Sequence, residues 1–169
     1  MIRFTCKSCG QVHEGMPSFG WDYPIQYLEI PQEEREERAS LGSDDCVIDE
    51  KWFFVRGCIE IPVHGEREAF SWGVWVSLSN ESFEQFLEYF GEKKRSHIGP
   101  FFGWLSSHIW IYPETLNLKS KVHLRDDGIR PYIELEPTDH RLAVEQRSGI
   151  TIERVEEIHE KMTHPEKYA

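Results

Sequence analysis

The residues with the clearest potential for chemistry are Cys6 and Cys9, which form a Cys-x-x-Cys turn followed by Gly10. Two thiolates at this spacing can bind one metal ion from a single turn, because backbone amides stabilise the charge on sulfur. Gly10 suits a position where a tight turn requires positive φ. The pattern resembles a zinc knuckle, and a structural zinc ion normally has four ligands. Two further donors must therefore come from elsewhere in the chain.

The nearest further donors are His13, four residues after Cys9, and Cys46, the next thiol in the sequence. We therefore predict a closed, structural Zn²⁺ site formed by Cys6, Cys9, His13 and Cys46. Alternatively, Cys46 is a small buried apolar residue and His13 a surface or hydrogen-bonded histidine. A redox Cys-x-x-Cys normally opens a helix in a thioredoxin-like pattern, which the residues after Gly10 do not resemble.

A second group of candidate residues consists of Glu134, Glu136 and His140. The two glutamates are two residues apart in a predicted strand and share one face, so they could act as paired carboxylates with His140 as a general base. The alternative is a solvated strand face followed by a helix cap. Neither a Gly-x-Ser-x-Gly nucleophile motif nor a glycine-rich phosphate loop occurs. The catalytic residues, if any exist, are therefore unknown from the sequence.

Aromatic residues form a third group, because they make up 13% of the chain and include six tryptophans. Trp75 alternates onto the face of a predicted strand opposite Trp72, and Trp104 lies in a segment rich in Gly and Pro. Rings in such places can line a ligand or partner surface, or they can form a second core. The sequence-based candidates for binding are Trp75, Trp104, Arg130 and His140.

The elements that must position these groups follow from hydrophobic periodicity. Strands are expected over residues 2–5, 44–62, 70–78, 116–124 and 132–136. Helices are expected over residues 31–41, 79–91 and 138–146, with a last helix that Thr151 caps. Residues 91–114 read as a loop. The predicted class is α+β: an antiparallel sheet with flanking helices and a small N-terminal lobe that resembles a zinc knuckle.

Within these elements, residues 53–61 and 70–78 alternate with period two and are predicted to pair antiparallel through a connection at 64–67. In the helix over 79–91, Phe83, Phe86, Leu87 and Phe90 form one apolar stripe that is expected to face the core.

Length and charge limit what the protein can be. A chain of 169 residues favours one domain over 1–169, divided into a metal-knuckle lobe with a polar helix (1–45) and a sheet with helices (46–169). With 19 Lys and Arg against 30 Asp and Glu, the net charge is −11, which argues against nucleic acid and anionic lipid as partners. It is compatible with a basic protein partner. Because no signal-like or membrane-spanning apolar segment is visible, a cytoplasmic location is expected.

With these motifs in view, the chain resembles a bacterial family, the domain of unknown function 2199 family. The resemblance rests on motifs spread from Phe4 to about Ile158: Phe4-Thr5-Cys6-x-x-Cys9-Gly10-x-x-His13-x-Gly15-x-Pro17, Cys46-Val47-Ile48-Asp49, Trp72-Gly73-Val74-Trp75-Val76-Ser77-Leu78-Ser79, Phe102-Gly103-Trp104-Leu105 and Arg130-Pro131-x-Ile133-Glu134-Leu135-Glu136-Pro137. It implies a single bacterial domain and supplies no activity, substrate or catalytic residue.

Two classes of function are therefore expected. The first is a protein-interaction or ligand-binding module with a structural zinc, for example an immunity or antitoxin protein that binds a basic toxin. The second is a metal-assisted hydrolase that uses an open zinc position or the Glu134, Glu136 and His140 group. The number of protein ligands around the metal discriminates between them, because zinc catalysis needs an open position.

Overall fold

The computed structural model describes residues 1–168 as a mixed α and β protein. The strands are β1 (Arg3–Thr5), β2 (Val12–Glu14), β3 (Ser18–Gly20), β4 (Ala39–Leu41), β5 (Asp45–Ile48), β6 (Trp52–Ile61), β7 (Phe70–Leu78), β8 (Phe101–Leu105), β9 (Lys119–His123) and β10 (Tyr132–Leu135). The helices are α1 (Ile25–Glu29), α2 (Arg35–Arg38), α3 (Asn80–Tyr89), α4 (Arg141–Ser148) and α5 (Ile152–Thr163), with 3₁₀ turns at Gln32–Glu34 and Pro165–Lys167. Among these residues no helix is long and apolar enough to cross a membrane.

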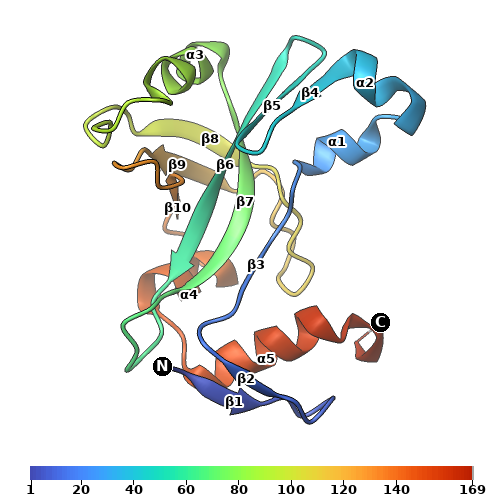
Figure 1. The fold of residues 1–169 in the computed structure, drawn as a ribbon, viewed down its shortest axis with the longest axis vertical. Helices are drawn as coiled ribbons and strands as arrows, with labels where there is room; N and C mark the ends of the chain where they lie inside the picture. Colours follow the sequence, from blue (N-terminus) through green and yellow to red (C-terminus); the bar gives the residue numbers. More distant parts are fainter. Residues whose placement is uncertain (169) are drawn as a thin grey trace.

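The long antiparallel pair of β6 and β7 runs through the molecule (Figure 1). Its register pairs Phe53 with Leu78 and Ile61 with Phe70, which confirms the predicted pairing. On β7 the alternating residues Phe70, Trp72 and Val74 are buried, as period two requires. They belong to the main core, which α3, α4 and α5 help to cover.

The prediction was an antiparallel sheet with flanking helices. The observed sheet instead curls into a small barrel. Strands β6 to β10 follow one another, and β10 closes on β6 as a parallel pair through the register of Tyr132 with Cys58. The backbone N–H of Cys58 donates to Pro131 O at 2.8 Å across this closure. Because five strands that alternate in direction bring the first and last into the same direction, a parallel closure follows from the strand count. A second parallel pair joins β3 to β7.

Strand β8 lies inside the segment that was predicted as a loop. Its residues alternate between buried and exposed, with Phe101 and Leu105 buried and Phe102 and Trp104 exposed. Gly103 is required here, because a Cβ at this position would collide with Val76 and lie 2.6 Å from Ser77 O on β7. The density of Gly and Pro around residues 91–114 hid this short strand from the sequence prediction.

The predicted helix over 31–41 is also replaced. A 3₁₀ turn and the four-residue α2 are followed by β4, in which Leu41 pairs with Cys46 of β5. The segment has no apolar stripe, so a long helix would bury nothing, whereas β4 gains pairing with β5.

In α3, the cap by Ser79 is confirmed, but Leu87 and Phe90 of its stripe are half exposed, and only Phe83 and Phe86 are buried.

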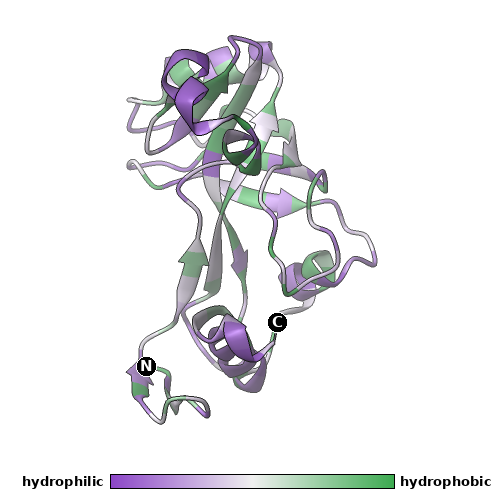
Figure 2. Cartoon of the chain, turned by 90° about the vertical axis from the view of Figure 1, so that its right-hand side faces the viewer, coloured by the Kyte–Doolittle hydropathy of each residue, from purple (hydrophilic) through white to green (hydrophobic). Residues whose placement is uncertain are grey.

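The molecule is elongated, and its two ends are formed by different parts of the chain (Figure 1 and Figure 2). The hairpin of β1 and β2 lies beside α5 at one end, whereas α1, α2, β4 and β5 lie at the other. The residues grouped as one lobe over 1–45 are therefore divided between the two ends. The N-terminal cysteines consequently face α5, near the C-terminus.

Candidate metal centre

The turn between β1 and β2 holds the two N-terminal cysteines. The backbone N–H of Gly10 donates to Cys6 O at 2.9 Å, and the N–H of Cys6 donates to Gln11 O at 2.9 Å. Gly10 has φ 73°, so the expectation of a left-handed residue in this turn is confirmed. Cys6 is buried at the end of β1, whereas Cys9 is exposed at the tip of the turn.

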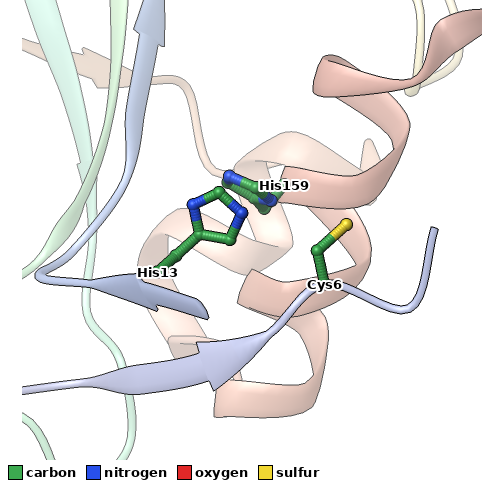
Figure 3. Close-up of side chains that lie close together, drawn as sticks. All are labelled: Cys6, His13 and His159. Carbon is green, nitrogen blue, oxygen red and sulfur yellow. The ribbon is translucent and has the colours of Figure 1, made fainter. Parts of the chain in front are cut away.

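Two histidine rings lie beside Cys6. His13 comes from β2, where it pairs with Phe4 of β1, and His159 is a buried residue of α5. The two ring centroids are 4.2 Å apart, and Figure 3 shows Cys6, His13 and His159 together between the hairpin and the helix. Phe4 packs edge-on against His159 at 5.1 Å between ring centroids, which restricts the position of that ring.

The donor atoms form two groups that share Cys6. In one group, the ligand atoms of Cys6, His13 and His159 all lie within 4.8 Å of one another. In the other, those of Cys6, Cys9 and His164 meet the same limit. His164 follows α5 directly, so both ends of the chain contribute to this Cys/His cluster, which we define as Cys6, Cys9, His13, His159 and His164.

The cluster has unused hydrogen-bonding capacity. His13 Nε2 and His159 Nδ1 are buried and have no hydrogen-bond partner within the described part of the chain. A buried polar atom without a partner costs about 1–3 kcal/mol, so native proteins rarely leave two such atoms together. Imidazole nitrogen and thiolate sulfur are the donors that Zn²⁺ prefers, so the residues present fit this ion.

The surroundings favour the ligand forms of these groups. Burial raises the pKa of the Cys6 thiol, but hydrogen bonds from the backbone of Cys9 and Ser8 and from the side chains of Cys9 and His164 outweigh it, so the pKa is lowered. Burial lowers the pKa of His159, and the positive charges of His13 and His164 lower it further. Thiolate at Cys6 and neutral imidazole at His159 are the forms that bind metal.

Further contacts hold the turn against α5. Ser8 Oγ donates to a carboxylate oxygen of Glu160 on α5. Lys167 Nζ reaches Ser8 O at 3.5 Å from the 3₁₀ turn that follows the helix. The polar contacts on this side are few, and β1 and β2 have only three residues each. A hairpin of this size is only marginally stable by itself.

Cys46, the predicted fourth ligand, does not join this cluster. It lies on β5 in a separate apolar cluster with Ile30, Phe54 and Trp75, and its side chain is fully buried. No group of metal-ligating side chains in residues 1–168 includes it. The alternative interpretation, a small buried apolar residue, describes its position. The sequence suggested Cys46 because it is the next thiol along the chain, but β5 lies at the opposite end of the molecule.

We expect Cys46 to resist alkylation by iodoacetamide in the folded protein at pH 8 and to react only in denaturant. Burial raises the pKa of its thiol to about 12, with a smaller contribution from Asp45, and the thiolate is the reactive form. Peptide mass spectrometry after timed labelling measures this. The partly exposed Cys58 is the internal control and should be labelled before Cys46. Equal rates for the two thiols would contradict the buried placement.

The structure does not bring Glu134, Glu136 and His140 into one catalytic group. Glu134 and Glu136 line a common surface hollow on β9 and β10. His140 instead caps α4, with Nδ1 accepting from the backbone N–H of Leu142 at 3.1 Å. Its Nε2 therefore carries the proton and lies 3.1 Å from Pro113 O. Because both ring nitrogens are engaged, His140 has no free nitrogen to act as a general base, and the hydrolase based on this group is set aside.

The remaining candidate binding residues lie in three different places. Trp75 is fully buried, and its Nε1 donates to Trp21 O at 2.9 Å, so it forms part of a second core rather than a binding surface. Arg130 is exposed and pairs with Asp44 at 3.0 Å. Trp104 is half exposed and lines a large cavity with Trp52 and Phe54.

Sequence reasoning missed His159 and His164 because they are about 150 residues from the cysteines along the chain. One signal was available for His159. His159 follows Val155 by four residues, so it lies on the apolar face of α5. Val155 and Ile158, which form this face, are both buried. A histidine on the buried face of a helix needs a polar partner.

Comparison with protein families finds a match over residues 5–150 to the DUF2199 model, which is described as "Uncharacterized protein conserved in bacteria". The matched range contains Cys6, Cys9 and His13 and ends before His159 and His164. Searches of curated proteins and of solved structures gave no match.

Proposed function

Because the chain belongs to this bacterial family of uncharacterised proteins, whose description assigns no activity, we propose a function from the geometry of the cluster. The protein is a binding module whose fold is completed by one structural Zn²⁺ ion. The ion is bound by Cys6 and Cys9 together with imidazole nitrogens from His13, His159 and His164. It joins the N-terminal hairpin to α5.

One observation carries this proposal: two thiols and three imidazoles from both ends of the chain meet around Cys6. Cys6 belongs to both groups of close donor atoms, so an ion beside its sulfur would lie next to donors of either group. The unpartnered nitrogens of His13 and His159 supply an independent reason for a ligand at this point.

The number of donors favours a structural ion over a catalytic one. A catalytic zinc site typically has three protein ligands and one open position for water or substrate. This cluster offers five candidate donors in two groups of three that share Cys6, and we propose that four of the five close around one ion. A closed site leaves the zinc-hydrolase alternative without its open position.

We expect the purified protein to contain one zinc ion per chain and the Cys6→Ser variant to contain almost none. Cys6 is shared by both donor groups, so its loss removes the centre of the site. Elemental analysis after gel filtration measures the metal content. Cys46→Ala is the matched control, because it removes an equally buried thiol at the other end of the molecule and should retain the ion.

Replacement of zinc by Co²⁺ assigns the individual ligands. The wild-type protein should show the absorption bands of tetrahedral cobalt with thiolate-to-metal charge transfer. Variants His13→Ala, His159→Ala and His164→Ala should each be compared with His97→Ala, which lies outside the cluster. A zinc-free wild-type protein after refolding with excess Zn²⁺, or full occupancy in Cys6→Ser, would overturn the proposal.

A further inference from the structure

A large cavity lies at the end of the molecule opposite the Cys/His cluster (Figure 1). It has a volume of about 800 Å³ and is lined by residues of α1, α2 and β5 together with residues of β6, β7 and β8. We call it the tryptophan cleft and define it by Gln26, Glu29, Asp49, Trp52, Phe54 and Trp104. Sites for small molecules usually have volumes between about 300 and 1,000 Å³ and mostly apolar walls.

Two indole rings line the cleft while remaining open to solvent. Trp52 is 53% exposed and Trp104 is 41% exposed, although tryptophan is normally among the most buried residues. An ammonium group of the chain already lies near each ring: Lys51 Nζ is 5.1 Å from the Trp52 ring, and Lys119 Nζ is 6.0 Å from the Trp104 ring. The indole face is the best partner for such a cation among side chains.

The polar groups of the cleft are mainly hydrogen-bond acceptors. Gln26 Oε1 is buried and has no hydrogen-bond partner in residues 1–168. Glu29 is exposed and takes part in no ion pair of the described chain. Arg38, which lines the cleft, is already paired with Asp49 through two hydrogen bonds of 2.9 and 2.8 Å, and the other nearby cations, Lys51 and Lys119, lie over the indole rings. A ligand that supplies N–H donors and positive charge would satisfy the acceptors that remain.

We propose that the tryptophan cleft binds a small organic amine that carries a ring or another apolar body. The apolar body would pack against Trp52, Trp104 and Phe54, and the ammonium group would donate to Glu29 and to Gln26 Oε1. This inference does not depend on zinc, because none of the cluster residues lines the cleft. The net charge of −11 also favours a cationic ligand over an anionic one.

Three probes that share a phenyl ring test the proposal: 2-phenylethylamine, 2-phenylethanol and phenylacetate. They carry a cation, a neutral hydroxyl and an anion at pH 7, so they separate the ring from the charge. Isothermal titration should show binding of the amine to the zinc-loaded full chain, weaker binding of the alcohol, and none of the acid. Trp104→Ala should weaken amine binding about tenfold, and Glu29→Gln should weaken it about threefold.

Trp110→Ala is the matched control, because Trp110 is 39% exposed but lies outside the cleft. It should bind the amine as the wild type does. Unchanged zinc content and unfolding temperature in all three variants would show that the fold and the metal site are intact. Absence of amine binding, equal binding of the alcohol or the acid, or equal losses in Trp104→Ala and Trp110→Ala would overturn the proposal.

Discussion

Removal of zinc is expected to lower the thermal unfolding midpoint by about 8–16 °C. An ion present at about a thousand times its dissociation constant stabilises the folded state by about 4 kcal/mol. In a domain of about 150–250 residues, each 1 kcal/mol shifts the midpoint by about 2–4 °C. The expected loss is large here because the hairpin of β1 and β2 has three residues in each strand and few other polar contacts with α5.

The measurement is differential scanning calorimetry with and without a chelator. Cys6→Ser should unfold at the temperature of the chelated wild type and should not respond to the chelator. Cys58→Ser should behave as the untreated wild type, because Cys58 lies on β6 outside the cluster. A chelator effect of equal size in Cys6→Ser and in the wild type would place the metal elsewhere.

Hydrogen exchange locates the effect of the metal. Without zinc, the amides of β1, β2 and the C-terminal half of α5 should exchange faster, whereas those of the barrel strands β6 and β7 should change little. This follows because local opening is governed by the contacts of the segment itself. A uniform increase over the whole chain would instead indicate that the ion stabilises the entire core.

The second large effect is expected from Glu145→Ala, which should lower the free energy of unfolding by about 3–5 kcal/mol. Glu145 is buried on α4 and accepts from Arg154 Nε of α5 at 2.8 Å. It also accepts from Tyr112 Oη at 2.7 Å. Arg154 is itself buried, its Nη1 lies 3.2 Å from Glu157 Oε2, and its Nη2 has no hydrogen-bond partner among residues 1–168. Loss of the Glu145 carboxylate would leave the buried Arg154 guanidinium with only the more exposed carboxylate of Glu157 as a partner.

This group joins three segments that are distant in sequence: the connection between β8 and β9, helix α4 and helix α5. Burial raises the pKa of Tyr112, and the Glu145 carboxylate raises it further, so the hydroxyl remains a donor throughout the physiological range. The buried ion pair therefore holds α4 and α5 together beneath the end of the barrel.

Urea denaturation measures the effect, with Glu153→Ala on α5 as the control. Glu153 is exposed and should change stability by less than about 1 kcal/mol. The double variant Glu145→Leu with Arg154→Leu should recover much of the loss, because two apolar residues remove the unpaired charge. A loss below about 1 kcal/mol in Glu145→Ala would mean that Arg154 finds water or another acceptor.

Local sequence patterns predicted the elements that depend on neighbours along the chain. The period of two in residues 70–78 indicated β7, and the stripe of Val155 and Ile158 indicated α5, which Thr151 caps as expected. These patterns are reliable because one apolar face must be buried whatever the rest of the fold does. The Cys6 and Cys9 turn was also visible in the sequence, because the two thiols are only three residues apart.

Only the tertiary structure decided the features that depend on contacts between residues far apart in the sequence. The closure of β10 on β6, the burial of Trp75 in a second core and the exposure of Trp104 in the cleft all require knowledge of what covers each face of the sheet. The strongest case is the Cys/His cluster. The sequence identified the two thiols and His13, but the packing of α5 on the hairpin brings His159 and His164 to them and leaves Cys46 at the far end. A metal ligand set is defined by distances of a few ångströms in space, and only the folded chain fixes those distances.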